Sequence, residues 1–166
     1  ISTEKCSYYE NGKLALLRQR PADEIKENEP KFEKIAEVDL PMKAERISES
    51  VLLVTPPTIQ KPSWSVFPLD FDRQTLPAGM FSFNSRFPQS LNVTFGESRF
   101  VLAPNSVKTV DGKIKEGGRA IGLSISQGSQ ILFSKKWLHV NSKRGMFFLN
   151  ASENGLKVTR FVDSPR

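Results

Sequence analysis

One stretch decides the fold: LPAGMFSFNSRFPQSLNVTFGESRFVLAPNSVKTV, from Leu76 to Val110. It predicts three or four short strands separated by turn residues. In its middle, apolar residues alternate with other residues on both sides of the dipeptide Gly96-Glu97. Side chains of a strand switch faces at every residue, and residues paired across antiparallel strands point the same way. The loop must therefore hold an even number of residues to bring both apolar sets to one face.

A two-residue turn at Gly96-Glu97 meets this requirement. Glycine in the first position favours a type II′ turn, which needs a positive φ there. The turn pairs Val93 with Phe100 and Leu91 with Leu102. A slip of one residue would turn one of the two apolar sets toward water.

The rest of the chain is also typical of strands. Short apolar or alternating segments occur at 13–19, 50–55, 64–69, 121–125, 130–140, 146–151 and 156–162. Residues 31–40 fit a helical spacing as well as an alternating one, and we favour a strand because the neighbouring segments are strands. About ten short strands with turn residues between them predict an all-β fold, an antiparallel β-sandwich or a partly closed barrel.

Two segments give finer predictions. Residues 130–140 are apolar on both faces, which predicts a central strand covered on both sides. The dipeptide Asn154-Gly155 favours a type I′ turn, and this turn would pair Phe147 with Val162 and Ala151 with Val158.

Composition predicts one soluble domain over residues 1–166, with 38% hydrophobic and 25% charged residues. Residues 19–30, bounded by prolines and rich in acids, predict an exposed loop. No apolar run reaches the roughly 20 residues that span a bilayer. Because the chain begins at Ile1, we expect a product whose targeting segment has been removed. Cys6, the only cysteine, is an incidental thiol or lies near an export or lipid-attachment site.

The formal charge of +6 is unevenly distributed. Residues 1–50 hold nine Lys/Arg against eleven Asp/Glu, whereas residues 51–166 hold fifteen against seven. Such asymmetry can mark a face that binds polyanions. However, only Lys135-Lys136 and Lys143-Arg144 are adjacent in that second part, so a solvated basic surface is favoured and a nucleic-acid partner is not.

Motifs of enzymes are absent from the sequence, which contains no nucleophile elbow, P-loop, dinucleotide fingerprint or zinc-protease signature. His139, the single histidine, is interpreted as a strand residue hydrogen-bonded at the sheet surface. Asp70 and Asp72 are interpreted as part of a solvated turn and not as paired carboxylates. We therefore predict no catalytic residue, no metal site and no cofactor.

The aromatic residues are better candidates for a binding surface. Trp64, Trp137, Tyr8 and Tyr9 could form a platform on which sugars stack, and Lys135 places a cation on the same strand face as Trp137. Lys136 must point to the opposite face. The predicted ligand-binding residues are Trp137, Lys135 and Trp64.

The stretch 76–110, together with the segments KKWLHV and RGMFFL, resembles a group of uncharacterised exported β-proteins of environmental bacteria. The shared pattern is a Pro-Gly turn, an aromatic strand that ends in Asn, a V-x-x-G hairpin and an L-x-P exit. The resemblance implies an exported or periplasmic sandwich and no activity. The resulting hypothesis is a non-enzymatic module of the cell envelope that contacts a protein or a glycan. A carbohydrate- or polyanion-binding domain is the alternative, and a hydrolase is the weakest one.

Overall fold

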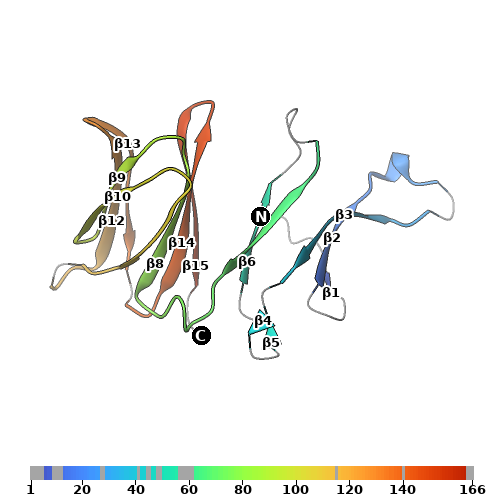
Figure 1. The fold of residues 1–166 in the computed structure, drawn as a ribbon, viewed down its shortest axis with the longest axis horizontal. Helices are drawn as coiled ribbons and strands as arrows, with labels where there is room; N and C mark the ends of the chain where they lie inside the picture. The colour runs from blue at the N-terminus through green and yellow to red at the C-terminus, as the bar shows by residue number, and fades with distance from the viewer. Residues whose placement is uncertain are drawn as a thin grey trace. The chain divides into compact units, whose positions relative to one another are not determined.

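The structure is a computed structural model, and it describes residues 6–8, 13–26, 29–40, 42–43, 46–47, 50–55, 62–114, 116–139 and 141–163. The described residues form fifteen strands and one short 3-10 turn (Figure 1). The predicted all-β class is therefore confirmed. Where the sequence predicts one domain, the chain divides into two compact units, residues 1–75 and 76–166.

The first unit contains three small antiparallel sheets. β1 (Cys6–Tyr8), β2 (Lys13–Gln19) and β3 (Phe32–Asp39) form the largest, and its order follows the sequence. β4 (Met42–Lys43) pairs with β5 (Arg46–Ile47), and β6 (Ser50–Thr55) pairs with β7 (Ser65–Asp70). The ambiguous segment 31–40 is a strand, as predicted. Leu14, Leu16 and Val38 form a small core, against which Leu52 and Val66 pack.

The predicted loop 19–30 joins β2 to β3. It is exposed over most of its described residues and includes the 3-10 turn η1 (Ala22–Glu24). Arg20 closes the loop, because its backbone N–H donates to the carbonyl of Lys31 at 3.0 Å and its guanidinium pairs with Glu29 at 2.7 Å.

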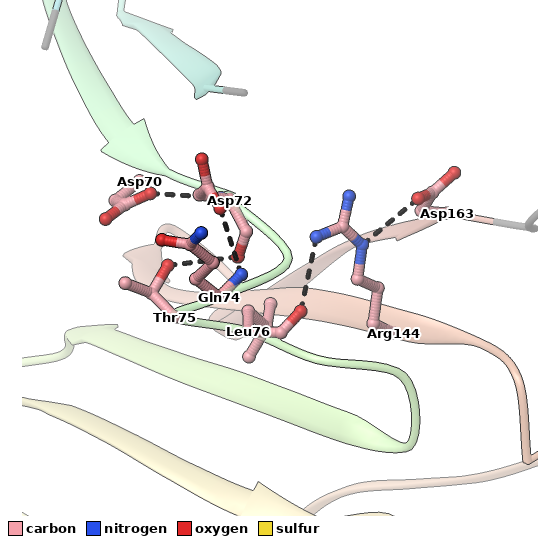
Figure 2. A network of polar contacts seen from close by, with 7 residues as sticks. All are labelled: Asp70, Asp72, Gln74, Thr75, Leu76, Arg144 and Asp163. Carbon is pink, nitrogen blue, oxygen red and sulfur yellow. Dashed lines mark hydrogen bonds and ion pairs between the residues drawn. The ribbon is translucent and has the colours of Figure 1, made fainter. Parts of the chain in front are cut away.

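The turn after β7 explains Asp70 and Asp72. The Asp70 carboxylate accepts a hydrogen bond from the Asp72 N–H at 3.0 Å, and the Asp72 carboxylate accepts one from the Gln74 N–H at 2.9 Å (Figure 2). Such bonds are typical of Asx turns. The interpretation as a turn is confirmed, but Asp72 is buried and not solvated.

The second unit is a β-sandwich of two four-stranded sheets (Figure 1). One sheet has the order β10 (Ser98–Leu102), β9 (Leu91–Phe95), β12 (Ala120–Gln127), β13 (Gln130–Leu138). The other has the order β11 (Val107–Asp111), β8 (Met80–Arg86), β14 (Arg144–Ser152), β15 (Gly155–Asp163). This second sheet is mixed, because β8 and β14 run parallel.

Phenylalanines from both sheets fill the core of the sandwich. Phe83 stacks on Phe147 with ring centroids 4.7 Å apart, and Phe95 meets each of them edge to face. Leu91, Val93, Ile121, Leu123 and Ile125 belong to the same core. The alternation of the sequence therefore identified the buried faces of β9 and β12 correctly.

The hairpin at Gly96-Glu97 has the predicted register, with Val93 opposite Phe100 and Leu91 opposite Leu102. Gly96 has a φ of +58°, and Glu97 has no positive φ, as a type II′ turn requires.

The predicted turn at Asn154-Gly155 is wrong by one position. The central residues are Glu153 and Asn154, and Gly155 follows with a φ of +99°. Ser152 pairs with Gly155, which is the pattern of a type I turn with glycine in the fourth position. Phe147 consequently pairs with Arg160 instead of Val162.

The prediction of a central strand at 130–140 is also wrong, since β13 is an edge strand. A β-bulge at Leu132 places Ile131 opposite Ser126 and Phe133 opposite Ile125. Ile131 is consequently 66% exposed, whereas Phe133 packs against the core. The strand buried on both faces is β14, in which six consecutive residues from Arg144 to Leu149 are buried.

Arg144 shows that one of the two basic dipeptides does not form a basic surface. Its side chain is buried, donates to the Leu76 carbonyl at 3.2 Å and pairs with Asp163 at 3.1 Å (Figure 2). Asp163 lies directly opposite it in the β14–β15 register. Arg144 therefore ties the start of the second unit to its last two strands.

Candidate functional site

A pocket of about 240 Å³ lies between the two sheets of the sandwich, at the side where β13 and β15 form the edges. We call it the β13–β15 pocket. Its lining residues come from six strands and the loop between β13 and β14: Phe81, Phe95, Ile121, Trp137, Leu138, His139, Lys143, Phe147, Arg160 and Val162.

The inner wall of the pocket is apolar and belongs to the core. Phe81, Phe95, Ile121 and Phe147 are each at most 5% exposed. The rings of Phe81 and Phe95 meet edge to face at 5.0 Å, which fixes their orientation. The pocket is therefore closed on its inner side and opens between the strand edges.

Two cations line the same pocket. The Arg160 guanidinium lies 4.5 Å from the centre of the Trp137 ring, a cation–π contact, and Lys143 is half-buried. Burial lowers the pKa of Arg160, although a guanidinium stays charged at pH 7. None of the described residues that line the pocket is an Asp or a Glu. Neither cation forms an ion pair within the described part of the chain.

His139 lies one residue beyond the end of β13, and its backbone N–H donates to the Arg119 carbonyl at 3.0 Å. Its ring lies 6.1 Å from the Phe81 ring inside the pocket. The interpretation as a strand residue at the sheet surface is therefore wrong. Burial lowers the pKa of the imidazole, Lys143 lowers it further, and Asp111 opposes both effects.

The lowered pKa of His139 determines the direction in which the stability of the fold changes with pH. The fold favours the neutral imidazole, so the unfolded chain binds more protons as the pH falls below about 6.5. The stabilisation by neutral His139 is complete above that pH and is lost as the pH falls through the lowered pKa of the folded state. We expect the melting temperature of the natural chain to fall more between about pH 7 and pH 5 than that of His139→Gln. Thermal unfolding followed by the fluorescence of Trp137, with Trp64 replaced by Phe so that the signal reports on the second unit alone, measures both melting temperatures. An identical fall would contradict the assignment.

The residues predicted to bind a ligand lie in different parts of the structure. Trp137 lines the pocket, but Arg160 covers one face of its ring, and Phe133 and Phe147 pack beside it. A sugar could stack on that ring only by displacing these side chains. Lys135 lies outside the lining, with its ammonium 5.9 Å from the centre of the Phe133 ring.

The remaining aromatic candidates lie elsewhere. Trp64 belongs to the first unit, where it is half-buried just before β7. Tyr8 is in β1, and Tyr9 lies outside the described residues. Lys135 and Lys136 point to opposite faces of β13, as predicted, because Lys135 is opposite buried Leu123 and Lys136 is opposite Gly122.

Sequence reasoning missed Arg160 and Lys143. A signal for Arg160 exists, because it interrupts the apolar series Leu156, Val158 and Val162 on the inward face of β15. A cation within an apolar stripe indicates either a paired charge or a binding site. Lys143 lies in a loop and gives no comparable signal.

A wider groove, also lined by His139, contains the residue types that the hydrolase alternative would need. Asp111, His139 and Ser142 all line it. A triad needs the acid to orient the histidine through a hydrogen bond. Among the described residues no hydrogen bond joins these three side chains, and Asp111 pairs with Lys113 at 3.3 Å. The groove brings the residue types together without the geometry of a triad.

The described residues contain no group of three or more His, Cys, Asp or Glu side chains able to hold a metal ion. They also contain no helix that is long and apolar enough to cross a membrane. No protein-family model matches the chain, and comparison with curated proteins gives no match.

Proposed function

We propose that this protein is a non-enzymatic binding module that takes an anionic ligand into the β13–β15 pocket. The supporting observation is that Arg160 and Lys143 both line a pocket that no described carboxylate lines. Neither cation has an ion-pair partner among the described residues, and a half-buried cation such as Lys143 attracts an anion more strongly than a fully solvated lysine does.

The test compares matched charge removals. In the full-length protein, Arg160→Gln is expected to weaken the binding of phenyl phosphate, phenyl sulfate or phenylacetate about tenfold, the loss typical of a charge-assisted hydrogen bond. Lys157→Gln is the control, because Lys157 lies on the same strand and points to the other face. Isothermal titration calorimetry at low salt measures both. Binding of none of the three anions, or equal losses in the two variants, would refute the proposal.

The wider hypothesis of an interaction module in the cell envelope stays a proposal. The edge strand β13 has exposed Ile131 and Leu138, which a partner strand could cover. The bulge at Leu132 and the pair Lys135-Lys136 are, however, devices that discourage pairing at an edge. The pocket is therefore the better-supported binding site.

Export to the periplasm or envelope is supported by the family resemblance alone, and fractionation of the source cells would test it.

A further inference from the structure

The four-stranded sheet β10-β9-β12-β13 has an outer face as well as the face that packs in the core. Along β9 and β12, buried residues alternate with residues that point away from the core. Thr94 and Ser124 belong to this outer face and lie opposite each other. The register extends the row to both edge strands, with Arg99 opposite Thr94 and Ser134 opposite Ser124. A row of polar side chains therefore crosses the outer face of the sheet.

A groove of about 560 Å³ lies on this face, and we call it the outer groove. All four strands line it, together with the Gly96-Glu97 turn and Ile114 and Gly118 of the loop between β11 and β12. Lys136 lines it from β13 and pairs with Gly122 on β12. Because Gly122 has no side chain, the backbone itself forms part of the groove floor.

The polar groups of this face are not used by the fold. Among the described residues, Arg99 and Lys136 line the groove and make no ion pair. The three hydroxyls of the row make no hydrogen bond to another described residue. Glu97 is the one described carboxylate that lines the groove, so its lining has a net positive charge. These groups are therefore available to a ligand that carries both negative charges and hydroxyls.

The two cations stand on opposite edges of the sheet. The strand order places three strand spacings, about 14 Å in all, between Arg99 on β10 and Lys136 on β13. One small anion would contact both only if both side chains bent across the sheet. A chain with several acid groups contacts each cation separately, and the hydroxyls of the row lie along its path.

The distribution of apolar residues does not suit a protein partner. Protein interfaces have an apolar centre and a polar rim. On this face Val101 and Ile131, each more than 60% exposed, belong to the edge strands, and they lie opposite Asn92 and Ser126 of the central strands. The polar residues therefore occupy the centre and the apolar residues the rim, which is the reverse arrangement.

A nucleic acid is also disfavoured. The outward positions of these four strands hold no aromatic residue on which bases could stack. Binding a duplex involves about 6–10 phosphate contacts, whereas the groove has two cations.

We infer that the outer groove binds a segment of an acidic polysaccharide, a chain of hydroxylated rings that carry carboxylates. The carboxylates pair with Arg99 and Lys136, the ring hydroxyls bond to the polar row, and a flat ring lies against the backbone at Gly122. This site is a second one, because the outer groove and the β13–β15 pocket share no lining residue.

Four oligomers of six units separate charge from hydroxyls on the unmodified chain. Hexagalacturonate has both, maltohexaose has the hydroxyls alone, hexaglutamate has the carboxylates alone, and hexathymidylate represents a single-stranded nucleic acid. We expect hexagalacturonate to bind at least about tenfold more tightly than each of the others in calorimetry at low salt. Equal binding of any other oligomer, or no binding of hexagalacturonate, would overturn the inference.

Lys136 and its neighbour Lys135 provide a matched pair of variants. Lys135 lies on the same strand but points to the other face, opposite buried Leu123. Lys136→Gln and Arg99→Gln are each expected to weaken hexagalacturonate binding about tenfold, whereas Lys135→Gln should change it by less than about twofold. Equal losses from Lys135→Gln and Lys136→Gln would refute the site.

A variant at the groove floor tests the position of the ligand without changing a charge. A Cβ added at Gly122 meets only the Lys136 stem, at 3.7 Å, so the strand admits a side chain there. Gly122→Val should weaken hexagalacturonate binding at least about tenfold, because its methyl groups occupy the floor. Unchanged binding by a Gly122→Val protein with the natural circular dichroism spectrum would place the ligand elsewhere.

Arg160→Gln separates the outer groove from the proposed anion pocket. It should leave hexagalacturonate binding within about twofold, because Arg160 lines only the β13–β15 pocket of the two. A loss from Arg160→Gln with none from Lys136→Gln would place the polysaccharide in the pocket, refute the outer groove and leave the proposed function standing.

Discussion

Replacing Phe83 with alanine is expected to lower the free energy of unfolding of the second unit by about 3–5 kcal/mol. The Phe83 ring is fully buried and contacts three other rings, those of Phe95, Phe100 and Phe147, with centroids 5.2, 5.3 and 4.7 Å away. Its removal leaves a cavity between the two sheets. Buried aromatic pairs also contribute beyond the area that they bury.

The measurement must report on the second unit alone, because the chain has two compact units and need not unfold in one step. Trp137 in a Trp64→Phe background provides such a signal, since the chain has only these two tryptophans. Urea unfolding followed by this fluorescence gives the free energy. Thr94→Ala, on the outward face of β9, is the control and should cost much less. A comparable loss from Thr94→Ala would mean that the buried face is inverted.

The same reasoning applies to Phe100, which the predicted hairpin places on the inward face opposite Val93. From the sequence, Phe100 is a residue of the inward face, and full burial would make its loss as costly as that of Phe83. It is only half-buried, because β10 is an edge strand. Phe100→Ala should therefore cost less than Phe83→Ala.

The turns show what sequence can and cannot decide. At Gly96-Glu97 the alternation on both sides and the glycine agree on one register. Near Gly155 the predicted and observed registers differ by two residues, so the side chains of both strands keep their faces. Alternation cannot separate these two registers. A glycine with positive φ also fits either turn type, so the local signal was ambiguous.

The β-bulge at Leu132 explains the error in β13. Strict alternation places Ile131 and Phe133 on one face, but one extra residue between them sends Ile131 outward. The apolar residues on both faces therefore predicted a central strand covered on both sides, whereas β13 is an edge strand. The continuous burial of β14 depends on its position within the sheet, which no local pattern reveals.

The pocket could not be predicted for a related reason. Trp137 and Arg160 are 23 positions apart, and they meet only because β13 and β15 form edges at the same side of the sandwich. Trp137 could be proposed from its residue type alone. To predict that Arg160 is its partner, and that the charge beside its ring is positive, one would need the order of the strands in both sheets.

The last prediction concerns Gly96, where backbone conformation and space act together. A Cβ on Gly96 would lie 2.0 Å from the Lys113 carbonyl oxygen. That oxygen also accepts the Glu97 N–H at 3.1 Å, so moving it away breaks a hydrogen bond of the turn. Gly128, the first residue of the two-residue turn between β12 and β13, has a similar φ of +55° but nothing within 4 Å of its added Cβ. Gly128→Ala therefore measures the conformational cost alone, about 1–2 kcal/mol.

Gly96→Ala should cost about 1–3 kcal/mol more than this control, because the neighbouring backbone must shift to admit the methyl group. Urea unfolding of both variants in the Trp64→Phe background gives the difference. Lys113 belongs to the loop that follows β11, so the excess destabilisation measures how firmly this loop is held against the hairpin. Equal losses from Gly96→Ala and Gly128→Ala would mean that the loop yields freely and that the close approach of Lys113 contributes nothing to stability.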